Sequence, residues 1–401
     1  MTSTTNSDIL AWLASRREGM IDLLRDLVNA DSGTWDKAGV DAAGKVLSDF
    51  WRSHGLEVRT HPHPVFGDGV SGHLAAREGG AERPILLLGH RDTVFPKGEP
   101  TRRPFTIREG RGYGPGVADM KSGLVIEAFV IAAFAAAGGL SAPIVMLTTS
   151  DEEIASPSSR ELIQAFARDA RAVFNAEPAR EADAPPGGGN TRTQVITGGR
   201  KGGVFMKAAI TGKAAHSGAR YELGRSAILD LAQKVAPLHA LTDLAAGVTV
   251  NVGMIGGGQT VNTIAPSAWA EIDLRYVHPD QRGRLIEAIR RIVETPVVDG
   301  TTGALAVTGE FLPLTESDAG RQLLDIYRSA AASLGVEVTA EFTGGCADSG
   351  LTAAVDCPTL CSIGPCGGGG HTPEEFVVID SLLPTAQTLA LAVSETAARF
   401  R

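Results

Sequence analysis

The sequence predicts an α/β protein of two domains, in which helices flank a mostly parallel sheet and a smaller α+β domain is inserted. Its 401 residues exceed the length of one average domain. Continuous apolar runs, typical of strands buried on both faces, alternate with helical patterns in the first 180 residues. After the Pro- and Gly-rich segment 182–190, which is expected to be a loop or linker, this pattern changes, and it returns after about Gly309.

The first segment alternates helices and strands. Apolar residues at helical spacing predict helices, and short apolar runs bounded by turn residues predict strands. The helix at 122–137 is rich in Ala and is stopped by Gly138 and Gly139. Expected helices cover 9–29, 39–54 and 122–137, and expected strands start at 55 and cover 84–89, 142–150 and 172–175.

The inserted segment has a β-α-β-β-α pattern that can form its own small two-layer sandwich. Its expected strands are 204–210, 248–255 and 268–275, and its expected helices are 226–239 and 279–294. The sequence after the insert is expected to form helix 318–334, strand 336–342 and a final helix 379–398. These boundaries divide the chain into a main domain of 1–201 and 310–401 and an insert of 202–309.

Composition excludes several classes of protein. The formal net charge of −9 argues against nucleic acid as a partner, because phosphate binding requires clustered Lys and Arg. No apolar run approaches the roughly 20 residues that span a bilayer, and the N-terminal residues do not resemble a signal peptide. We therefore expect a cytoplasmic protein that does not bind membranes. The cysteines lack metal-site spacing and are expected to be small buried or loop residues: Cys346, Cys357, Cys361 and Cys366.

Five short stretches offer imidazole or carboxylate groups, and four of the five follow a strongly apolar run. A strand that ends in such a group places it at the rim of a sheet, where α/β folds build their sites. Carboxylates and imidazoles without thiolates suit zinc, and also cobalt or manganese. The stretches therefore predict a site for two metals. They are Gly-His90-Arg-Asp92-Thr-Val, Gly-Val-Ala-Asp119-Met-Lys-Ser-Gly, Ser-Asp-Glu152-Glu153, Asn-Ala-Glu177-Pro and Gly-His371-Thr-Pro-Glu-Glu.

Each stretch alone also has an ordinary structural explanation. His90 and Asp92 can be a polar strand end, although in an extended segment Asp92 can accept the ring N–H of His90 and fix its tautomer. Asp119 can simply place a negative charge at a helix N-terminus. Glu152 and Glu153 repel each other in a solvated loop, whereas a pair of metals would reverse that cost and let one ligate while the other acts as a base. Their joint occurrence favours the metal site.

As a set, these stretches resemble the M20 metallopeptidases, which include glutamate carboxypeptidases, acetylornithine deacetylase, succinyl-diaminopimelate desuccinylase and aminoacylases. The resemblance covers nearly the whole chain and adds the motif Gly212-Lys-Ala-Ala-His216-Ser-Gly. It implies a zinc-peptidase-like catalytic domain of residues 1–201 and 310–401. It also implies that residues 202–309 form a lid and dimerisation domain, and that the protein is a homodimer.

The same resemblance implies roles for individual residues. Two Zn²⁺ per subunit are expected, with Asp119 as the bridging ligand. Glu152 is expected to be the general base and Asp92 the support for His90. His216 is expected to reach the substrate carbonyl, often from the partner subunit. The implied first metal site is His90, Asp119 and Glu177, and the second is Asp119, Glu153 and His371.

Two further residues match lid positions that hold the substrate carboxylate. These are Asn262 and Arg275, which on their own also fit a strand-end Asn and a surface Arg. The expected activity is cleavage of an amide or peptide bond beside a free carboxylate, and the stretches 212–223 and 343–348 look most like the glutamate carboxypeptidase branch. Around 307–311, however, the sequence lacks an arginine that this branch can carry for a side-chain carboxylate. An N-acyl-amino-acid deacylase, of the aminoacylase or acetylornithine deacetylase type, is therefore the alternative.

The sequence also bears on two other classes of function. A non-catalytic binding protein of the same fold would lack the base or a ligand, whereas Glu152 and every ligand are present. A nucleotide-binding enzyme needs a Gly-rich phosphate loop directly after a strand. The Gly-Tyr-Gly segment at 112–114 does not follow a strand in that way. Both classes are therefore disfavoured.

Overall fold

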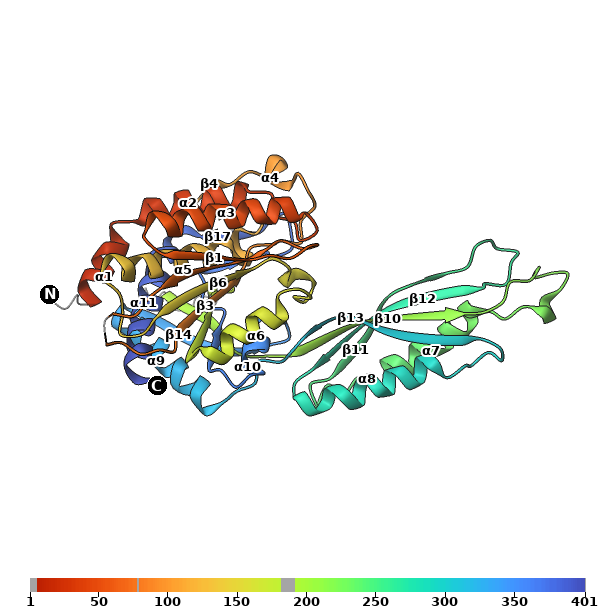
Figure 1. Cartoon of the computed structure of the whole chain (residues 1–401). Coiled ribbons are helices and arrows are strands. Elements are labelled where there is room, and N and C mark those ends of the chain that lie inside the picture. Colours follow the sequence, from red (N-terminus) through yellow and green to blue (C-terminus); the bar gives the residue numbers. More distant parts are fainter. Residues whose placement is uncertain (1–5, 78, 182–191, 401) are drawn as a thin grey trace, which may run out of the picture. The chain divides into compact units, whose positions relative to one another are not determined.

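The computed structural model describes residues 6–77, 79–181 and 192–400 (Figure 1). The loop expected at 182–190 lies outside the described residues. The chain divides into two compact units. Unit 1 comprises residues 1–199, 316–343 and 347–401, and unit 2 comprises residues 200–315 and 344–346. Each has a hydrophobic core of its own.

Unit 1 is built on a nine-stranded sheet of order β1-β2-β6-β3-β7-β15-β9-β14, with β8 paired to β9. Its centre is parallel, because β3 pairs in parallel with β6 and β7, and β7 with β15. The pairs β1–β2, β2–β6 and β15–β9 are antiparallel. The strands are β1 (Glu57–His61), β2 (Gly69–Leu74), β3 (Ile85–His90), β6 (Ile144–Thr149), β7 (Ala172–Asn175), β8 (Arg180–Glu181), β9 (Arg192–Arg200), β14 (Val336–Thr343) and β15 (Thr359–Cys361).

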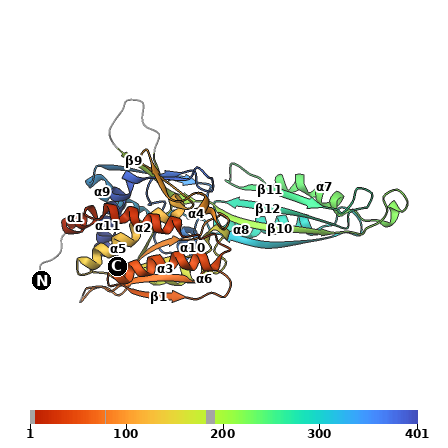
Figure 2. The same ribbon diagram turned by 90° about the horizontal axis from the view of Figure 1, so that it is seen from above.

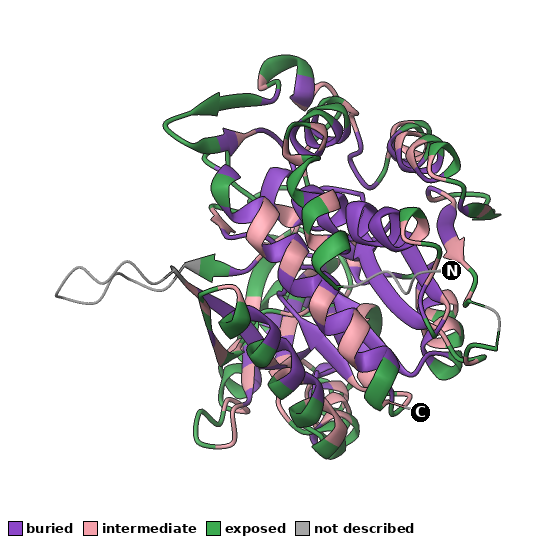
Figure 3. Ribbon diagram, turned by 90° about the vertical axis from the view of Figure 1, so that its left-hand side faces the viewer, coloured by how far each residue is buried: buried purple, intermediate pink, exposed green. Residues whose placement is uncertain are grey.

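Helices cover both faces of this sheet, and Figure 1 shows α3 and α6 on opposite sides of the strands. The buried strands lie behind helices whose outer surfaces are exposed (Figure 3). Helix α5 is predominantly apolar and is almost completely buried, as expected of a helix at the centre of a domain. The helices are α1 (Asn6–Ala14), α2 (Arg17–Asn29), α3 (Lys37–Ser53), α4 (Glu99–Arg102), α5 (Ser122–Ala136), α6 (Arg160–Asp169), α9 (Asp318–Ser333), α10 (Ser349–Ala353) and α11 (Leu382–Arg399).

Two expected helices differ in detail. The helix expected at 9–29 is two helices, because the chain breaks at Ser15 and Arg16 between α1 and α2. The final helix begins later than residue 379, since Ile379–Ser381 form a separate tight turn before α11. A small antiparallel sheet, β16-β17-β5-β4, was not expected, because its strands are too short to show a period in sequence. These strands are β4 (Thr106–Arg108), β5 (Arg111–Tyr113), β16 (Gly367–Gly368) and β17 (Phe376–Val378).

Unit 2 is an antiparallel four-stranded sheet of order β11-β12-β10-β13, covered by two helices (Figure 2). The inward-facing residues of the alternating strands form its core with α7 and α8. The β-α-β-β-α expectation missed the last strand, β13, because apolar residues occupy exposed as well as buried positions and its sequence does not alternate. The elements are β10 (Gly202–Thr211), α7 (Ala227–His239), β11 (Thr249–Gly257), β12 (Ser267–Tyr276), α8 (Pro279–Glu294) and β13 (Thr302–Phe311).

The expected fold class is therefore confirmed: helices flank a large sheet with a parallel centre, and separate antiparallel sheets accompany it. Unit 2, residues 200–315 and 344–346, is slightly larger than the expected insert of 202–309, and at the C-terminal end of that insert β13 continues to Phe311. Its roles as a lid and in dimerisation remain predictions. No helix in the described part of the chain is both long and apolar enough to cross a bilayer.

Candidate metal centre

The parallel strands of unit 1 bring three of the five motifs to one edge of the sheet. β3 pairs with β6 from Ile85↔Ile144 to His90↔Thr149, and with β7 from Ile85↔Ala172 to Leu88↔Asn175. The carboxyl ends of the three strands therefore coincide. His90 ends β3, Glu152 and Glu153 follow β6, and Glu177 follows β7. This is the edge at which open α/β sheets place their sites.

Asp92 is a fully buried carboxylate that links His90 to the turn after β6. Its Oδ1 lies 3.3 Å from His90 Nδ1, and its two oxygens accept the backbone N–H groups of Glu152 and Glu153 at 3.2 and 3.3 Å. The hydroxyl of Thr34 donates a third hydrogen bond to the carboxylate, at 2.8 Å. With Nδ1 held by Asp92, the ring proton of neutral His90 is on that nitrogen, and Nε2 presents a lone pair to the site.

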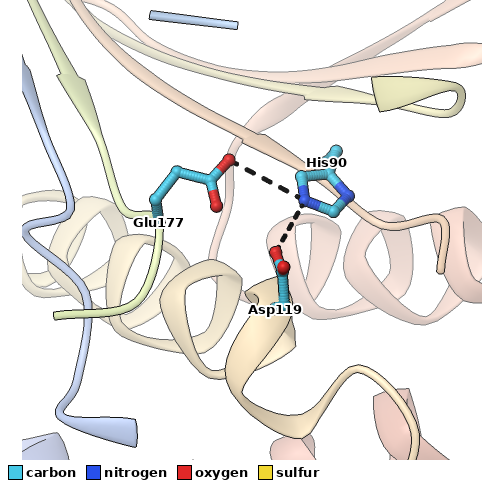
Figure 4. A group of neighbouring side chains, drawn as sticks. All are labelled: His90, Asp119 and Glu177. Atoms are coloured by element: carbon cyan, nitrogen blue, oxygen red, sulfur yellow. Dashed lines mark hydrogen bonds and ion pairs between the residues drawn. The ribbon is translucent and has the colours of Figure 1, made fainter. Parts of the chain in front are cut away.

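The Nε2 atom of His90 faces a cluster of carboxylates (Figure 4). It lies 3.2 Å from Asp119 Oδ1 and 3.8 Å from Glu177 Oε1. Glu152 Oε2 is 3.9 Å from the same nitrogen. One ligand atom from each of His90, Asp119 and Glu177 lies within 4.8 Å of the others, a spacing that could hold a metal ion.

Asp119 comes from the segment Val117–Lys121 directly before α5, and its own backbone is not helical. The Asp119–Met120 peptide bond is cis. The start of α5 packs tightly on the end of β7, because a Cβ atom at Gly123 would lie 2.0 Å from the carbonyl oxygen of Ala176. Glycine at this position therefore allows the segment that carries Asp119 to approach Glu177.

Glu375 holds the same segment from the other side. This buried carboxylate accepts backbone N–H groups from Gly116, Ala118 and Asp119 at 2.9, 2.8 and 3.0 Å. Burial raises the pKa of Glu375 to about 7, although these three hydrogen bonds act in the opposite direction. Glu375 lies four residues after His371, so the same motif supplies a candidate ligand and fixes the backbone of another.

His371 completes a second group, which shares Asp119 with the first. Its Nε2 lies 3.4 Å from Asp119 Oδ2 and 3.2 Å from Glu153 Oε2. His371 lies between β16 and β17 with a φ of 64°, an uncommon conformation for a residue other than glycine. The atoms of Asp119, Glu153 and His371 also lie within 4.8 Å of one another.

The charges of this cluster fit a site for cations. Burial raises the pKa of Glu152 well above its ordinary value; the nearby His90 charge lowers it, and the neighbouring carboxylate Glu177 raises it further. Burial also raises the pKa of Glu153, and raises that of Asp348 to about 7. Several buried carboxylates that disfavour each other's ionised form become compatible when divalent cations lie among them. The donor set, two imidazoles and several carboxylates, suits zinc and related metals.

His216 and Asn262 lie together in unit 2. The backbone N–H of Ser217 donates to the carbonyl oxygen of Asn262 at 3.0 Å. His216 is exposed, and its Nδ1 accepts the backbone N–H groups of Gly218 and Ala219 at 3.2 and 3.1 Å. In the neutral ring the proton is then on Nε2, which can donate a hydrogen bond to an oxyanion.

Arg275 lies at the other end of the unit 2 sheet. β12 begins at Ser267, opposite Thr211 of β10, and Arg275 is opposite Gly203. Its Nε donates to Asp273 Oδ1 at 2.8 Å, and its Nη1 lies 2.7 Å from the Cys346 sulfur. Arg275 is therefore anchored within unit 2 rather than being a loose surface arginine.

Three residues that support the cluster were not expected from sequence. Thr34 and Glu375 act through hydrogen bonds to Asp92 and to the backbone before α5. Asp348 accepts the hydroxyls of Ser156 and Thr149, the latter at 3.4 Å. A single Thr carries no signal in sequence, but Glu375 is the last residue of the stretch Gly-His371-Thr-Pro-Glu-Glu. The two adjacent glutamates of that stretch could have indicated that one of them has a structural role.

With this geometry defined, the class of protein is clear. The sequence matches peptidase family M20/M25/M40 over residues 86–395, and the chain belongs to this family. It is an M20 metallo-hydrolase, so the expected enzyme class is confirmed.

Individual relatives match over nearly their full length. Carboxypeptidase G2 of Pseudomonas sp. (strain RS-16) is 29% identical over 372 residues, which cover 91% of this chain and 86% of that protein. Acetylornithine deacetylase of Proteus mirabilis (strain HI4320) is 27% identical and covers 92% of this chain and 94% of its own. The M20 metallo-carboxypeptidase Sso-CP2 of Sulfolobus solfataricus has the same fold, with a TM-score of 0.77, 18% identity and coverage of 94% and 99%.

Proposed function

We propose that this chain hydrolyses an amide or peptide bond next to a free carboxylate, with two divalent cations and with Glu152 as the general base. The observation that carries the proposal is the pair of candidate ligand groups that share Asp119, with the Glu152 carboxylate 3.9 Å from His90 Nε2. His90, Asp119 and Glu177 would hold one cation. Asp119, Glu153 and His371 would hold the other. Zn²⁺ suits these donors best, and Co²⁺ or Mn²⁺ are substitutes.

Two bound cations would lower the pKa of a water and polarise the amide carbonyl. Glu152 would take the proton of the attacking water and deliver it to the leaving amine. Burial is the largest cause of the raised pKa of Glu152, and perturbed pKa values are typical of groups that transfer protons in active sites. Asp92 fixes the tautomer of His90, because its backbone carbonyl accepts from Nδ1 at 3.1 Å and its carboxylate lies 3.3 Å from the same nitrogen.

The main candidate substrate is a peptide with a C-terminal amino acid of the glutamate type. The likeness to carboxypeptidase G2 supports this choice. The alternative is an N-acyl amino acid, and the likeness to acetylornithine deacetylase favours it. Both reactions release an amine beside a carboxylate, so the same centre serves either.

A substrate panel tests the proposal. Zinc-loaded protein is offered N-acetyl amino acids and dipeptides with C-terminal Glu, Ala, Leu and ornithine, and released amine is measured. We expect hydrolysis of substrates with a free carboxylate, and loss of at least 100-fold in kcat/KM when that carboxylate is amidated, because removing one partner of a charged contact costs several kcal/mol. Hydrolysis of the amidated substrates at equal rates would contradict the proposed specificity.

The length of the unit 2 sheet supports a role for His216 in the active site of a partner subunit. Residues 267 and 275 of β12 are eight positions apart, so Arg275 and the His216–Asn262 end of the sheet are separated by roughly 27 Å. One small substrate cannot contact both ends of the same sheet. If His216 contacts the carbonyl of a substrate and Arg275 contacts the carboxylate of the same substrate, the two residues must come from two copies of unit 2. A homodimer with two-fold symmetry provides such a pair.

Complementation between inactive variants tests this arrangement. A Glu152→Gln protein and a His216→Ala protein are mixed in equal amounts under conditions that allow subunits to exchange. In each mixed dimer, one active site combines an intact Glu152 with an intact His216. We expect recovery of about a quarter of wild-type activity, since half of randomly assembled dimers are mixed and each has one working site. No recovery, with exchange demonstrated by a mass label, would place His216 in the site of its own subunit or outside the reaction.

A further inference from the structure

A cavity of about 580 Å³ in unit 1 adjoins the candidate metal centre. Its volume falls in the range of pockets that hold small organic ligands. Glu153, a candidate ligand of the second metal, lines both the cavity and the centre. The cavity is lined by residues of three segments: 33–36, 93–97 and 153–154.

Each of these segments also contributes to the metal centre. Trp35 directly follows Thr34, whose hydroxyl donates to Asp92. Val94 comes two residues after Asp92, and Ile154 directly follows Glu153. The first two segments are joined by backbone hydrogen bonds, from Thr34 N to Thr93 O at 3.1 Å and from Thr93 N to Ser32 O at 3.0 Å. The walls of the cavity are therefore fixed to the same backbone as the reacting groups.

Five of the eleven lining residues have apolar side chains, and two of the larger ones are exposed. Trp35 is 76% exposed and Val94 42% exposed. The Trp35 ring also contacts Phe66, with ring centroids 5.6 Å apart. A large aromatic side chain that remains so exposed beside a reactive centre gains much from being covered by a ligand.

The charges of the cavity indicate which part of a substrate it accepts. Lys97 is the single cation among its lining residues, and its Nζ is paired with Asp36 Oδ2 at 2.8 Å. Glu153 also belongs to the second candidate ligand group, so in the proposed function its charge is matched by the metal. With Lys97 paired, the lining residues offer no unpaired positive side chain to a substrate carboxylate, whereas an uncharged apolar group needs none.

Resting on the proposed function, we propose that this cavity binds the acyl side of the scissile amide and selects a bulky apolar group, in particular an aromatic acyl group. Trp35, Val94 and Ile154 are the specificity-determining residues. The cleaved amino acid and its carboxylate lie on the other side of the scissile bond. The class of substrate is thus an amino acid acylated with an arylalkyl or similar group, or a peptide with an aromatic residue before the scissile bond.

The test compares two substrates that share one amino acid and differ only in the acyl group, N-acetyl and N-phenylacetyl. The amino acid is the one that wild-type protein releases fastest. We expect wild type to prefer the phenylacetyl substrate at least tenfold in kcat/KM, which corresponds to about 1.4 kcal/mol. Trp35→Ala should lower that ratio at least tenfold, Trp35→Phe should keep most of it, and Phe342→Ala, which removes an exposed aromatic outside the cavity, should leave it as in wild type.

A second readout does not depend on turnover. Phenylacetate, the acyl product, should bind the wild-type protein in calorimetry, and Trp35→Ala should weaken that binding at least tenfold while bound zinc stays the same. If the ratio changes equally in Trp35→Ala and Phe342→Ala, the proposal is wrong. It is also wrong if Trp35→Ala alters selectivity between amino acids instead of between acyl groups. Absence of hydrolysis of any N-acyl amino acid or dipeptide by wild type would instead contradict the proposed function.

Discussion

Replacement of Glu152 by Gln is expected to lower kcat by about 10³-fold or more while the protein keeps its metal. The side chain of Gln has nearly the same size and can still accept a hydrogen bond, but it cannot take a proton from water. Glu152 is in neither of the two groups that could hold a metal. The measurement is kcat with the best substrate of the panel, together with zinc content by elemental analysis.

The adjacent residue provides the matched control. Glu153→Gln changes the same functional group one position further along, but Glu153 Oε2 lies 3.2 Å from His371 Nε2 in the second candidate ligand group. We expect this variant to lose one of the two metals first, and to regain activity as zinc is added in excess. Equal loss of metal in the two variants would refute the division of roles between the two acids.

The sheet edge of the site could be predicted because its signals are local. Each of the strands β3, β6 and β7 is a short apolar run followed by a polar motif, and parallel pairing then brings their ends together. The convergence of His90, Asp119 and Glu177 within 4.8 Å is consistent with the ligand set that the resemblance implied. Their roles as ligands remain predictions until metal is measured.

The supporting residues could not be predicted in the same way. Thr34 contacts Asp92 from 58 positions away, and Glu375 contacts the backbone of Asp119 from 256 positions away. Such pairs depend on tertiary packing and have no period or spacing in the sequence. The strand β13 was missed for a related reason: the sheet of unit 2 is covered on one face, but apolar residues also occupy exposed positions of this edge strand, so its sequence does not alternate. The cavity at Trp35 is likewise visible only when three distant segments are brought together.

Replacement of Asp119 by Ala is expected to remove both metals at once, because its two oxygens face the two candidate groups separately. Oδ1 lies 3.2 Å from His90 Nε2, and Oδ2 lies 3.4 Å from His371 Nε2. The protein should still fold, because the backbone N–H at position 119 can keep its hydrogen bond to Glu375 and the two imidazoles left without this partner can become neutral. Elemental analysis should show near zero zinc per chain and activity should be lost, with the circular dichroism spectrum unchanged.

Glu177→Ala is the matched control for Asp119→Ala, because Glu177 belongs to the first candidate group alone. It should lower zinc content to about one per chain, as expected when one of two sites loses a protein ligand. Titration with excess zinc should then show weak binding of a second zinc ion. If Asp119→Ala retains two zinc ions, or loses only the one that Glu177→Ala loses, Asp119 does not bridge the two metals. The proposed dinuclear centre would then have to be replaced by two independent sites, in which the water and the base Glu152 serve one metal only.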